Sequence, residues 1–376
     1  MPNLKEIITN PFWVLAIIFL GVLIVSIFRK KQISIKTPEV SVDGIHLDRN
    51  VNNPVISPSL LNKWENIGTF NPAIIKDDDG VVHMLYRAVG DDGLSRIGYA
   101  NSQDGIVFDE RYNYPVYVSV STFCIENECE EDRPHFYNPM VYASGGGWGG
   151  TEDPRAVVIG DRIYMTYTAF EGWGSVRMAL TSISMEDFKK GKWNWKKPKF
   201  ISSAKDINKN WVLFPEKLNG KFAVIHSISP EIRIGYIDDI DRIDEEFIQS
   251  SAPSGGREDQ WDNWVRGAGS PPIRTEIGWL LLYHAMDKSD PNKYKLGCMI
   301  LDFEDPTKIL YRSPSPILEP VENYENDEKP GVVYASGAIL QDDDLYVYYG
   351  GGDKHVCVAK TPLKPLLDWL VTYGKV

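Results

Sequence analysis

The sequence has few cysteines and fewer basic than acidic residues. The first shortage argues against a cysteine-based metal site, and the second argues against a nucleic-acid partner. Four cysteines occur in 376 residues, and their positions fit no zinc or iron–sulfur spacing. No Asp/His cluster has ligand spacing either, so nothing in the sequence demands a metal. Forty lysines and arginines face 52 aspartates and glutamates, which gives a formal net charge of −12. A phosphate backbone requires clustered basic residues, so we expect no nucleic-acid partner.

One long apolar run stands near the N-terminus. Residues 11–28 carry no charge over 18 positions, about the minimum for a helix that spans a bilayer. Basic residues follow at 29–31 and no small-residue cleavage site is visible, so we expect an uncleaved anchor over residues 1–31. The positive-inside rule then predicts a single-pass membrane protein whose globular domain is cytoplasmic. Residues 32–60 are expected to form a linker.

Long amphipathic helical patterns are missing from the rest of the chain, which instead repeats one short pattern. A Gly or Asp turn precedes about six apolar or aromatic residues, a typical strand length. The pattern occurs at residues 80–88, 161–169, 220–227, 278–285 and 344–351. A second strand similar to Ile-Gly-Tyr-Ala often follows, at residues 97–100, 234–236, 296–300 and 356–359. Five such units predict an all-β, five-bladed β-propeller over residues 61–376 with a short C-terminal helix. A β-sandwich is the alternative fold.

Residues 150–155, Gly-Thr-Glu-Asp-Pro-Arg, precede the second repeat and carry the chemistry that stands out most. Asp153 follows another carboxylate, and the proline after it restricts its backbone. A carboxyl group held this way can serve as a general acid if its surroundings raise its pKa. A Glu-Asp-Pro turn is also common in solvated loops, so this segment does not decide the function by itself.

Several further motifs join this segment in a characteristic order. They are Asn71-Pro72-Ala73, Leu85-Tyr86-Arg87, Arg96-Ile97-Gly98-Tyr99-Ala100, residues 209–217 (Lys-Asn-Trp-Val-Leu-Phe-Pro-Glu-Lys), residues 267–273 (Gly-Ala-Gly-Ser-Pro-Pro-Ile), Leu281-Leu282-Tyr283-His284 and Gly350-Gly351-Gly352-Asp353. In this order the set resembles glycoside hydrolase family 130, which contains β-mannoside phosphorylases and related β-mannosidases. The resemblance covers about residues 65–360.

The resemblance implies inverting cleavage of β-mannosides with Asp153 as the proton donor. In the phosphorylases inorganic phosphate attacks and mannose 1-phosphate forms, so phosphate is a co-substrate and no other cofactor is expected. Phosphate-binding residues of the family correspond to Lys209, Asn210, Arg266 and His284. Substrate-binding positions correspond to Asn71, Arg87, Arg96, Arg155 and Asp353. The expected partners are a β-mannoside oligosaccharide or glycoconjugate, inorganic phosphate and a membrane.

Because the sequence departs from the phosphorylase pattern at several positions, a hydrolase remains an alternative interpretation. Lys209 stands where the family usually has Arg, and Arg266 stands where it usually has Lys. The arginine that many phosphorylases carry after a histidine in the third repeat is absent. An inverting hydrolase needs a carboxylate base, for which Glu231 and Glu216 are the candidates. A non-catalytic, membrane-tethered glycan-binding propeller is the third interpretation. Phosphorolysis is the preferred one, because a cytoplasmic domain has phosphate available.

Overall fold

The computed structural model describes residues 44–118, 147–172, 175–203, 206–240, 248–250 and 255–376. Strands dominate this part of the chain, which confirms the predicted all-β class. Its helical elements are α3 (Met185–Lys189), η3 (Asn323–Glu325) and α4 (Leu363–Tyr373), and α4 buries its apolar face of Leu366, Leu367, Trp369 and Leu370.

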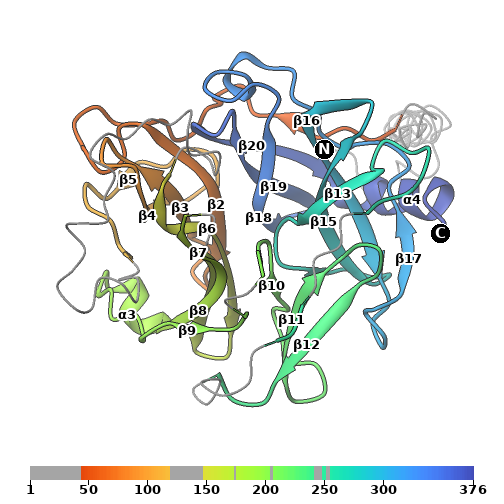
Figure 1. Cartoon of the computed structure of the whole chain (residues 1–376), viewed down its shortest axis with the longest axis horizontal. Coiled ribbons are helices and arrows are strands. Elements are labelled where there is room, and N and C mark those ends of the chain that lie inside the picture. The colour runs from red at the N-terminus through yellow and green to blue at the C-terminus, as the bar shows by residue number, and fades with distance from the viewer. Residues whose placement is uncertain (1–43, 119–146, 173–174, 204–205, 241–247, 251–254) are drawn as a thin grey trace, which may run out of the picture. The chain divides into compact units, whose positions relative to one another are not determined.

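The strands follow the chain as five antiparallel units, in which consecutive strands pair except in the fourth unit, where β13 and β14 both pair with β15 (Figure 1). The first unit contains β2 (Gly68–Lys76), β3 (Val82–Val89), β4 (Leu94–Ser102) and β5 (Glu110–Arg111). The second contains β6 (Gly149–Ile159), β7 (Arg162–Glu171), β8 (Val176–Ser184) and β9 (Lys199–Phe200). The third contains β10 (Val212–Leu213), β11 (Phe222–Ser227) and β12 (Arg233–Ile237).

The last two units lie in the C-terminal half of the chain. The fourth contains β13 (Trp264–Ala268), β14 (Ile273–Arg274), β15 (Trp279–Asp287), β16 (Asp290–Leu301) and β17 (Ile309–Arg312). The fifth contains β18 (Val333–Gln341), β19 (Asp344–Gly351) and β20 (His355–Pro362). Its outer edge pairs with β1 (Asp48–Arg49), a strand that lies within the predicted linker range.

The predicted five-bladed propeller with an N-terminal transmembrane helix is wrong as a description of this structure. The described strands form four sheets rather than five separate blades, because β4 and β6 pair in parallel and merge the first two units into one eight-stranded sheet. Glycine permits this merger. A Cβ atom at Gly150 would lie 2.2 Å from the Ser95 carbonyl oxygen, so only glycine lets the two backbones come this close. The repeat pattern in the sequence does not predict pairing between strands of different units.

The membrane prediction is corrected as well. Among the residues that the structure describes, no helix is long and apolar enough to cross a membrane. This finding contradicts the predicted single-pass membrane protein with a cytoplasmic domain. The segment predicted as its anchor, residues 11–28, lies outside the described residues.

Three units share a buried tyrosine, on β3, β15 and β19, that binds a buried carboxylate. In three units its hydroxyl donates to a buried carboxylate at 2.7–2.8 Å, and an arginine completes the network. The three sets are Tyr86–Glu65–Arg111, Tyr283–Asp262–Arg312 and Tyr349–Glu325–Arg49. Burial raises the pKa of each tyrosine, so the hydroxyl stays protonated and donates. Each network satisfies buried polar groups that would otherwise be costly.

A glycine on the neighbouring strand makes room for two of these three rings. Gly98 lies opposite Tyr86 in the ladder, and Gly297 lies opposite Tyr283. A Cβ atom at Gly98 would lie 2.3 Å from the Cζ atom of Tyr86, and one at Gly297 would lie 2.7 Å from that of Tyr283. The Ile-Gly-Tyr-Ala-like pattern in the sequence thus reflects ring packing across adjacent strands.

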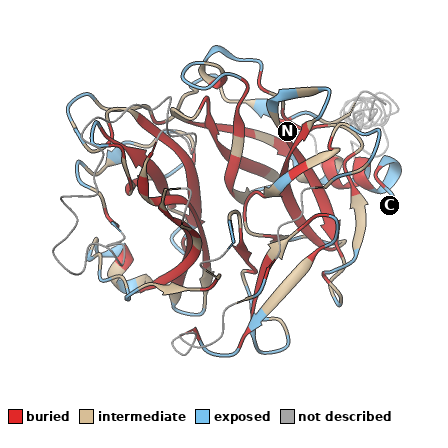
Figure 2. Cartoon of the chain, in the orientation of Figure 1, coloured by how far each residue is buried: buried red, intermediate tan, exposed pale blue. Residues whose placement is uncertain are grey.

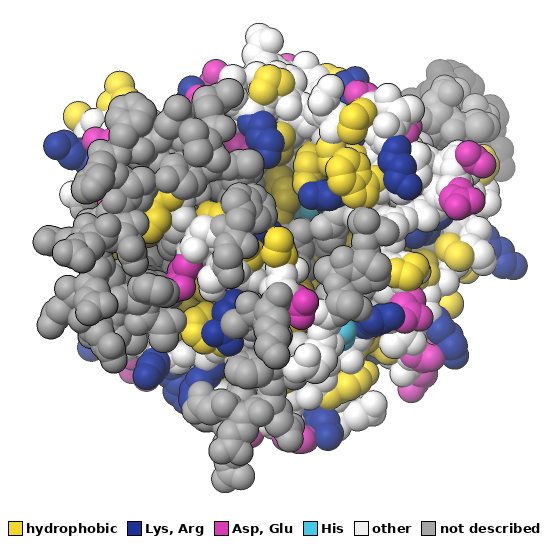
Figure 3. All heavy atoms as spheres, in the orientation of Figure 1, with side chains coloured by type: hydrophobic (Ala, Val, Ile, Leu, Met, Phe, Trp, Pro, Cys, Tyr) yellow, Lys and Arg dark blue, Asp and Glu magenta, His cyan; other side chains and the backbone are white. Residues whose placement is uncertain are grey.

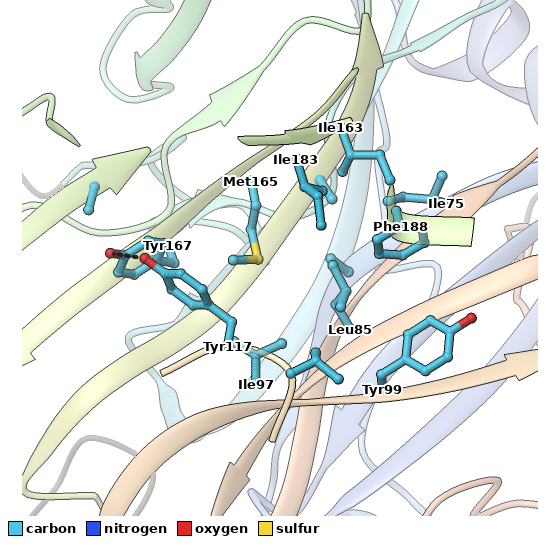
Figure 4. Packing of buried hydrophobic residues seen from close by; sticks show 14 of the residues in the cluster. Ile75, Leu85, Ile97, Tyr99, Tyr117, Ile163, Met165, Tyr167, Ile183 and Phe188 are labelled. Carbon is cyan, nitrogen blue, oxygen red and sulfur yellow. Dashed lines mark hydrogen bonds between the residues drawn. The ribbon is translucent and has the colours of Figure 1, made fainter. Parts of the chain in front are cut away.

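The hydrophobic core lies mainly between neighbouring units. In the cluster between the first two units, Leu85 from β3 packs near Met165 from β7 and Phe188 from α3 (Figure 4). Tyr117 and Tyr167 join their hydroxyls by a hydrogen bond of 2.9 Å in the same cluster. Similar clusters lie between the second and third, the third and fourth, and the fifth and first units. Because a fully buried large apolar side chain contributes about 1.5–3 kcal/mol, these clusters hold the units together.

The first strands of the units pack side by side and carry the irregularities that shape the site. Strand β2 packs against β6 and β18, and β10 packs against β6, near the centre of the view in Figure 1. Figure 2 shows these inner strands largely buried, with exposed residues mostly in the connections. Register shifts interrupt the first strand of four units, at Phe70/Ala73, Glu152/Arg155, Val265/Gly267 and Ala335/Gly337. Such bulges turn side chains away from the regular alternation.

The tyrosine packing can be tested with Gly98→Ala. The added methyl group would collide with the Tyr86 ring, so we expect the free energy of unfolding to fall by about 1–3 kcal/mol. Gly255→Ala is the control, because its Cβ would meet only the Ser229 hydroxyl, at 3.1 Å. Denaturant unfolding measures both variants, and equal losses would contradict the packing argument.

Candidate active site

Four predicted site residues share a backbone conformation that residues other than glycine seldom adopt. The φ angle is 49° at Asn71, 49° at Asp153, 64° at Asn210 and 52° at Asp353. Asn71 and Asp153 each precede a proline and lie inside the register shifts of β2 and β6. Left-handed backbone costs about 1–3 kcal/mol at a non-glycine residue, so it is kept only where the surroundings enforce it. Asn219, Asp259 and Asp342 share this conformation elsewhere in the described chain, so it accompanies the predicted site residues but does not define the site by itself.

The Asp153 carboxylate is buried and held through one oxygen. Its Oδ1 accepts hydrogen bonds from the Asn71 amide at 2.8 Å and from Arg87 Nη1 at 3.2 Å. Burial alone would raise the pKa of Asp153, but the charges of Arg87, Lys209 and Arg155 and the Asn71 hydrogen bond lower it to about 2. In the described residues no hydrogen bond reaches Oδ2, which leaves that oxygen for a ligand.

Glu152 links two of these cations in the interior. It is fully buried, accepts from Arg87 Nη2 at 2.8 Å, and pairs with Lys209 Nζ at 3.2 Å. The Arg87 guanidinium also lies over the Phe70 ring at 4.8 Å, and Lys209 Nζ lies over the Phe170 ring at 5.2 Å. The two cations therefore have fixed positions on either side of one carboxylate.

Arg155 is buried and directs its hydrogen bonds toward the protein. Nε donates to the Gly269 carbonyl at 2.7 Å, and Nη1 donates to the carbonyl of Asp153 at 3.0 Å. Nη2 donates to Asn210 Oδ1 and to the Tyr334 hydroxyl, each at 3.1 Å. This side chain thus ties β6 to the segments that carry Asn210, Gly269 and Tyr334.

His284 is fully buried beside Tyr334. The two rings stack with centroids 4.1 Å apart and an interplanar angle of 15°. Neither ring nitrogen has a hydrogen-bond partner among the described residues, and the Ala335 backbone lies nearby without hydrogen-bond geometry. Burial and the charge of Arg155 lower the pKa of His284 to about 3, so the imidazole is neutral near pH 7.

Three further predicted residues are paired at the surface or partly buried. Asp353 forms an ion pair with Lys329 at 3.1 Å and is close enough to Arg87 to raise the pKa of that guanidinium. Arg96 pairs with Asp92 on the same turn. Arg266 is exposed, and its Nε donates to the Tyr294 hydroxyl at 2.9 Å. Its backbone carbonyl accepts from the Asn210 amide at 3.1 Å, which connects it to the site.

The two carboxylates considered as hydrolytic bases lie apart from this arrangement. Glu231 pairs with Arg233 at 2.8 Å, and Glu216 pairs with Arg274 at 3.0 Å. Half or more of each glutamate side chain is exposed. No hydrogen bond or ion pair of the described residues joins either glutamate to Asp153. A search of the same residues for three or more His, Cys, Asp or Glu side chains able to hold a metal found no such group.

Side chains that sequence reasoning did not assign to the site are Glu152, Tyr334 and Lys329. Glu152 stands next to Asp153 in the sequence. Its partners Arg87 and Lys209 were both predicted site residues, so a buried carboxylate between them could have been expected. Tyr334 is the second residue of β18, and the register shift of that strand comes after it, between Ala335 and Gly337, so Tyr334 does not share the bulge position of Asn71 and Asp153 and no sequence signal marked it. Lys329 lies in the connection between η3 and β18, which contains no recognisable sequence motif. Figure 3 shows hydrophobic and Lys or Arg side chains together near the middle of one face, beside residues that are not described.

Comparisons with known proteins agree with the motif set. A family model of glycoside hydrolase family 130, described as "beta-1,4-mannooligosaccharide phosphorylase", matches residues 49–372. The chain is 36% identical to a 1,2-beta-oligomannan phosphorylase of Thermoanaerobacter sp. (strain X514), over 86% of this chain and 99% of that protein. It is 34% identical to a beta-1,2-mannobiose phosphorylase of the same organism, over 83% and 96%.

A solved structure shows the same likeness in three dimensions. The beta-1,2-mannobiose phosphorylase from Listeria innocua, in complex with beta-1,2-mannobiose, has a TM-score of 0.64 and 25% identity, and the match covers 87% of this chain and 100% of that one. The resemblance inferred from the motifs is thereby confirmed over most of the chain. This protein belongs to glycoside hydrolase family 130.

Proposed function

We propose that this protein cleaves β-mannosidic bonds with inorganic phosphate, and that Asp153 gives its proton to the departing sugar. The observation that carries the proposal is a buried carboxylate with one anchored and one unbonded oxygen, surrounded by fixed cations. The relatives that match nearly their full length are mannoside phosphorylases by name. A general acid next to a cationic site is what phosphorolysis requires.

The reaction exchanges one bond for another at the anomeric carbon. A phosphate oxygen forms a bond to C1 from the face opposite the leaving oxygen, while the C1–O bond to the second sugar breaks. The proton of Asp153 goes to that leaving oxygen. Attack from the opposite face inverts the β configuration, so the product is α-mannose 1-phosphate. Phosphate is itself the nucleophile, so the reaction needs no carboxylate base.

Asp153 can act as an acid only if its pKa is higher than in the protein alone, and bound phosphate raises it. With protein groups alone, Arg87, Lys209 and Arg155 hold that pKa at about 2, and a carboxylate cannot act as an acid at neutral pH. A phosphate anion beside Lys209 offsets positive charge and repels the carboxylate, which raises the pKa of Asp153. A sugar that displaces water has the same effect. Proton donation is therefore coupled to the presence of both substrates.

Lys209, Asn210 and His284 are the phosphate ligands that the contacts support best. Lys209 Nζ is only partly buried, so it can contact an anion while Glu152 holds it. Among the described residues Asn210 has one amide proton without an acceptor, because the other is donated to the Arg266 carbonyl. His284 offers a ring nitrogen without a partner. Arg266 lies at the exposed side, where its charge attracts the anion.

The mannose that is cleaved contacts Asn71, Arg87, Arg96 and Asp353 in this proposal. Asn71 is placed here because its amide donates to the Asp153 carboxylate at 2.8 Å. Arg155 differs from these, because its donors are committed to protein acceptors, and we assign it a positioning role. Two relatives carry β-1,2 linkage in their names, and we propose β-1,2-linked mannosides as the substrate class.

The product distribution tests the reaction type. Full-length protein is incubated with β-1,2-mannobiose with and without inorganic phosphate, and products are followed by phosphorus and proton NMR. We expect equal amounts of mannose and α-mannose 1-phosphate, formed only when phosphate is present. Free mannose released at the same rate in both reactions would refute phosphorolysis and direct attention to a carboxylate base.

The acid role is tested with Asp153→Asn. An amide cannot supply the proton, so we expect turnover of mannobiose to fall by about 10²–10⁴-fold, with disaccharide binding retained. Asp342→Asn is the matched control, because Asp342 also has a left-handed backbone (φ 53°) but is exposed at a turn. Rates come from initial velocities and binding from calorimetry. Unchanged turnover in the Asp153 variant would disprove the assignment.

Lys209→Met tests the phosphate site. Without the ammonium group, we expect KM for phosphate to rise by about tenfold or more, while KM for mannobiose stays within about threefold, because a charge-assisted bond to the anion is lost. Lys221→Met, which removes an exposed lysine paired with Asp238, should change neither constant. A rise in KM for mannobiose with no change for phosphate would place Lys209 at the sugar instead.

A further inference from the structure

Tyr334 occupies a central place among the groups that face the phosphate in the proposed function. Its hydroxyl donates to Asn210 Oδ1 and accepts from Arg155 Nη2 at 3.1 Å. Its ring stacks on His284, and the Arg155 guanidinium lies over the same ring at 5.8 Å. One side chain therefore contacts two of the proposed phosphate ligands and the arginine that holds the Asp153 backbone.

The Tyr334 hydroxyl is one of two donors that orient the Asn210 amide. Asn210 Oδ1 accepts from both Tyr334 and Arg155, which uses its two lone pairs. Asn210 Nδ2 is thereby turned the other way, where one of its protons reaches the Arg266 carbonyl at 3.1 Å. The remaining amide proton is available to an anion. A flipped amide would present its oxygen instead and repel phosphate.

The ring of Tyr334 fixes His284 in a comparable way. His284 has no hydrogen bond among the described residues that could orient it, and the stacked tyrosine at 4.1 Å is its ordered neighbour. Burial keeps the tyrosine hydroxyl protonated, since burial raises the pKa of Tyr334. The hydroxyl is thus a permanent donor toward Asn210, whichever phosphate species is bound.

We propose that Tyr334 is a positioning residue for phosphate, which holds the Asn210 amide with its N–H toward the anion and keeps the His284 ring in place. It acts through these two residues and does not itself touch the reacting atoms. This inference rests on the proposed phosphorolysis. It extends that function by naming a residue that orients two of the proposed phosphate ligands.

Tyr334→Phe in the full-length protein isolates the hydroxyl, because the stacked ring is retained. We expect KM for phosphate to rise about tenfold, the effect of one lost hydrogen bond in the network, with kcat at saturating phosphate and KM for mannobiose within about twofold. Tyr349→Phe is the matched control. Its buried hydroxyl also donates to one acceptor, Glu325 at 2.8 Å, but that acceptor belongs to a structural network. The control should lower thermal stability without changing KM for phosphate.

A double-mutant cycle with Asn210→Ala separates positioning from general loss of structure. If Tyr334 acts through Asn210, the Tyr334→Phe/Asn210→Ala double variant has the same KM for phosphate as Asn210→Ala alone. Additive effects, an unchanged KM for phosphate, or a parallel rise in both KM values would each overturn the inference. A wild-type protein whose sugar release ignores phosphate would refute the proposed function together with this inference. Phosphate-dependent turnover with an unaffected Tyr334→Phe variant would refute the inference alone.

Discussion

Glu152 and Asp153 place two adjacent carboxylates in the interior, where an ionised group without a partner costs several kcal/mol. The cations that compensate them come from elsewhere: Arg87 lies on β3 of the first unit, and Lys209 lies in the segment before β10 of the third. The carboxylates are therefore tolerated only after three units have come together. The same charges that make burial possible also lower the pKa of Asp153, so the stability of the buried carboxylates and the low pKa of Asp153 have one physical origin.

Backbone geometry reinforces this dependence. Asn71 and Asp153 adopt left-handed conformations within bulges of neighbouring strands, and the Asn71 amide binds the Asp153 carboxylate. A Cβ atom at Gly350 would lie 2.1 Å from Asn71 Oδ1, so the last unit presses its backbone against the first at this point. Strain of this kind persists when the surrounding packing over-determines it. The site is rigid because several units constrain the same few residues.

Strand alternation lets each second strand serve both stability and function. Tyr86 packs into its carboxylate network, and the next residue, Arg87, faces Asp153. Tyr283 and His284 repeat this arrangement in the fourth unit. Successive side chains of a strand point to opposite faces, so a tyrosine followed by a polar residue supplies one anchor and one site group. The pattern explains why repeat strands end in polar or small residues.

The sequence by itself determined the strands, the all-β class and the family resemblance, because each depends on residues close together in the chain. It also identified Asp153, Asn71 and Arg87, whose motifs are local. Only the tertiary structure decided that β4 and β6 join two units into one sheet, that Glu231 and Glu216 lie exposed beside arginines, and that Tyr334 contacts Asn210, Arg155 and His284. Arg87 and Asp153 are 66 residues apart, and Arg155 and Tyr334 are 179 apart. Local patterns of hydrophobicity and turn residues contain no information about which distant charges and hydroxyls will meet, since that follows from how the units pack.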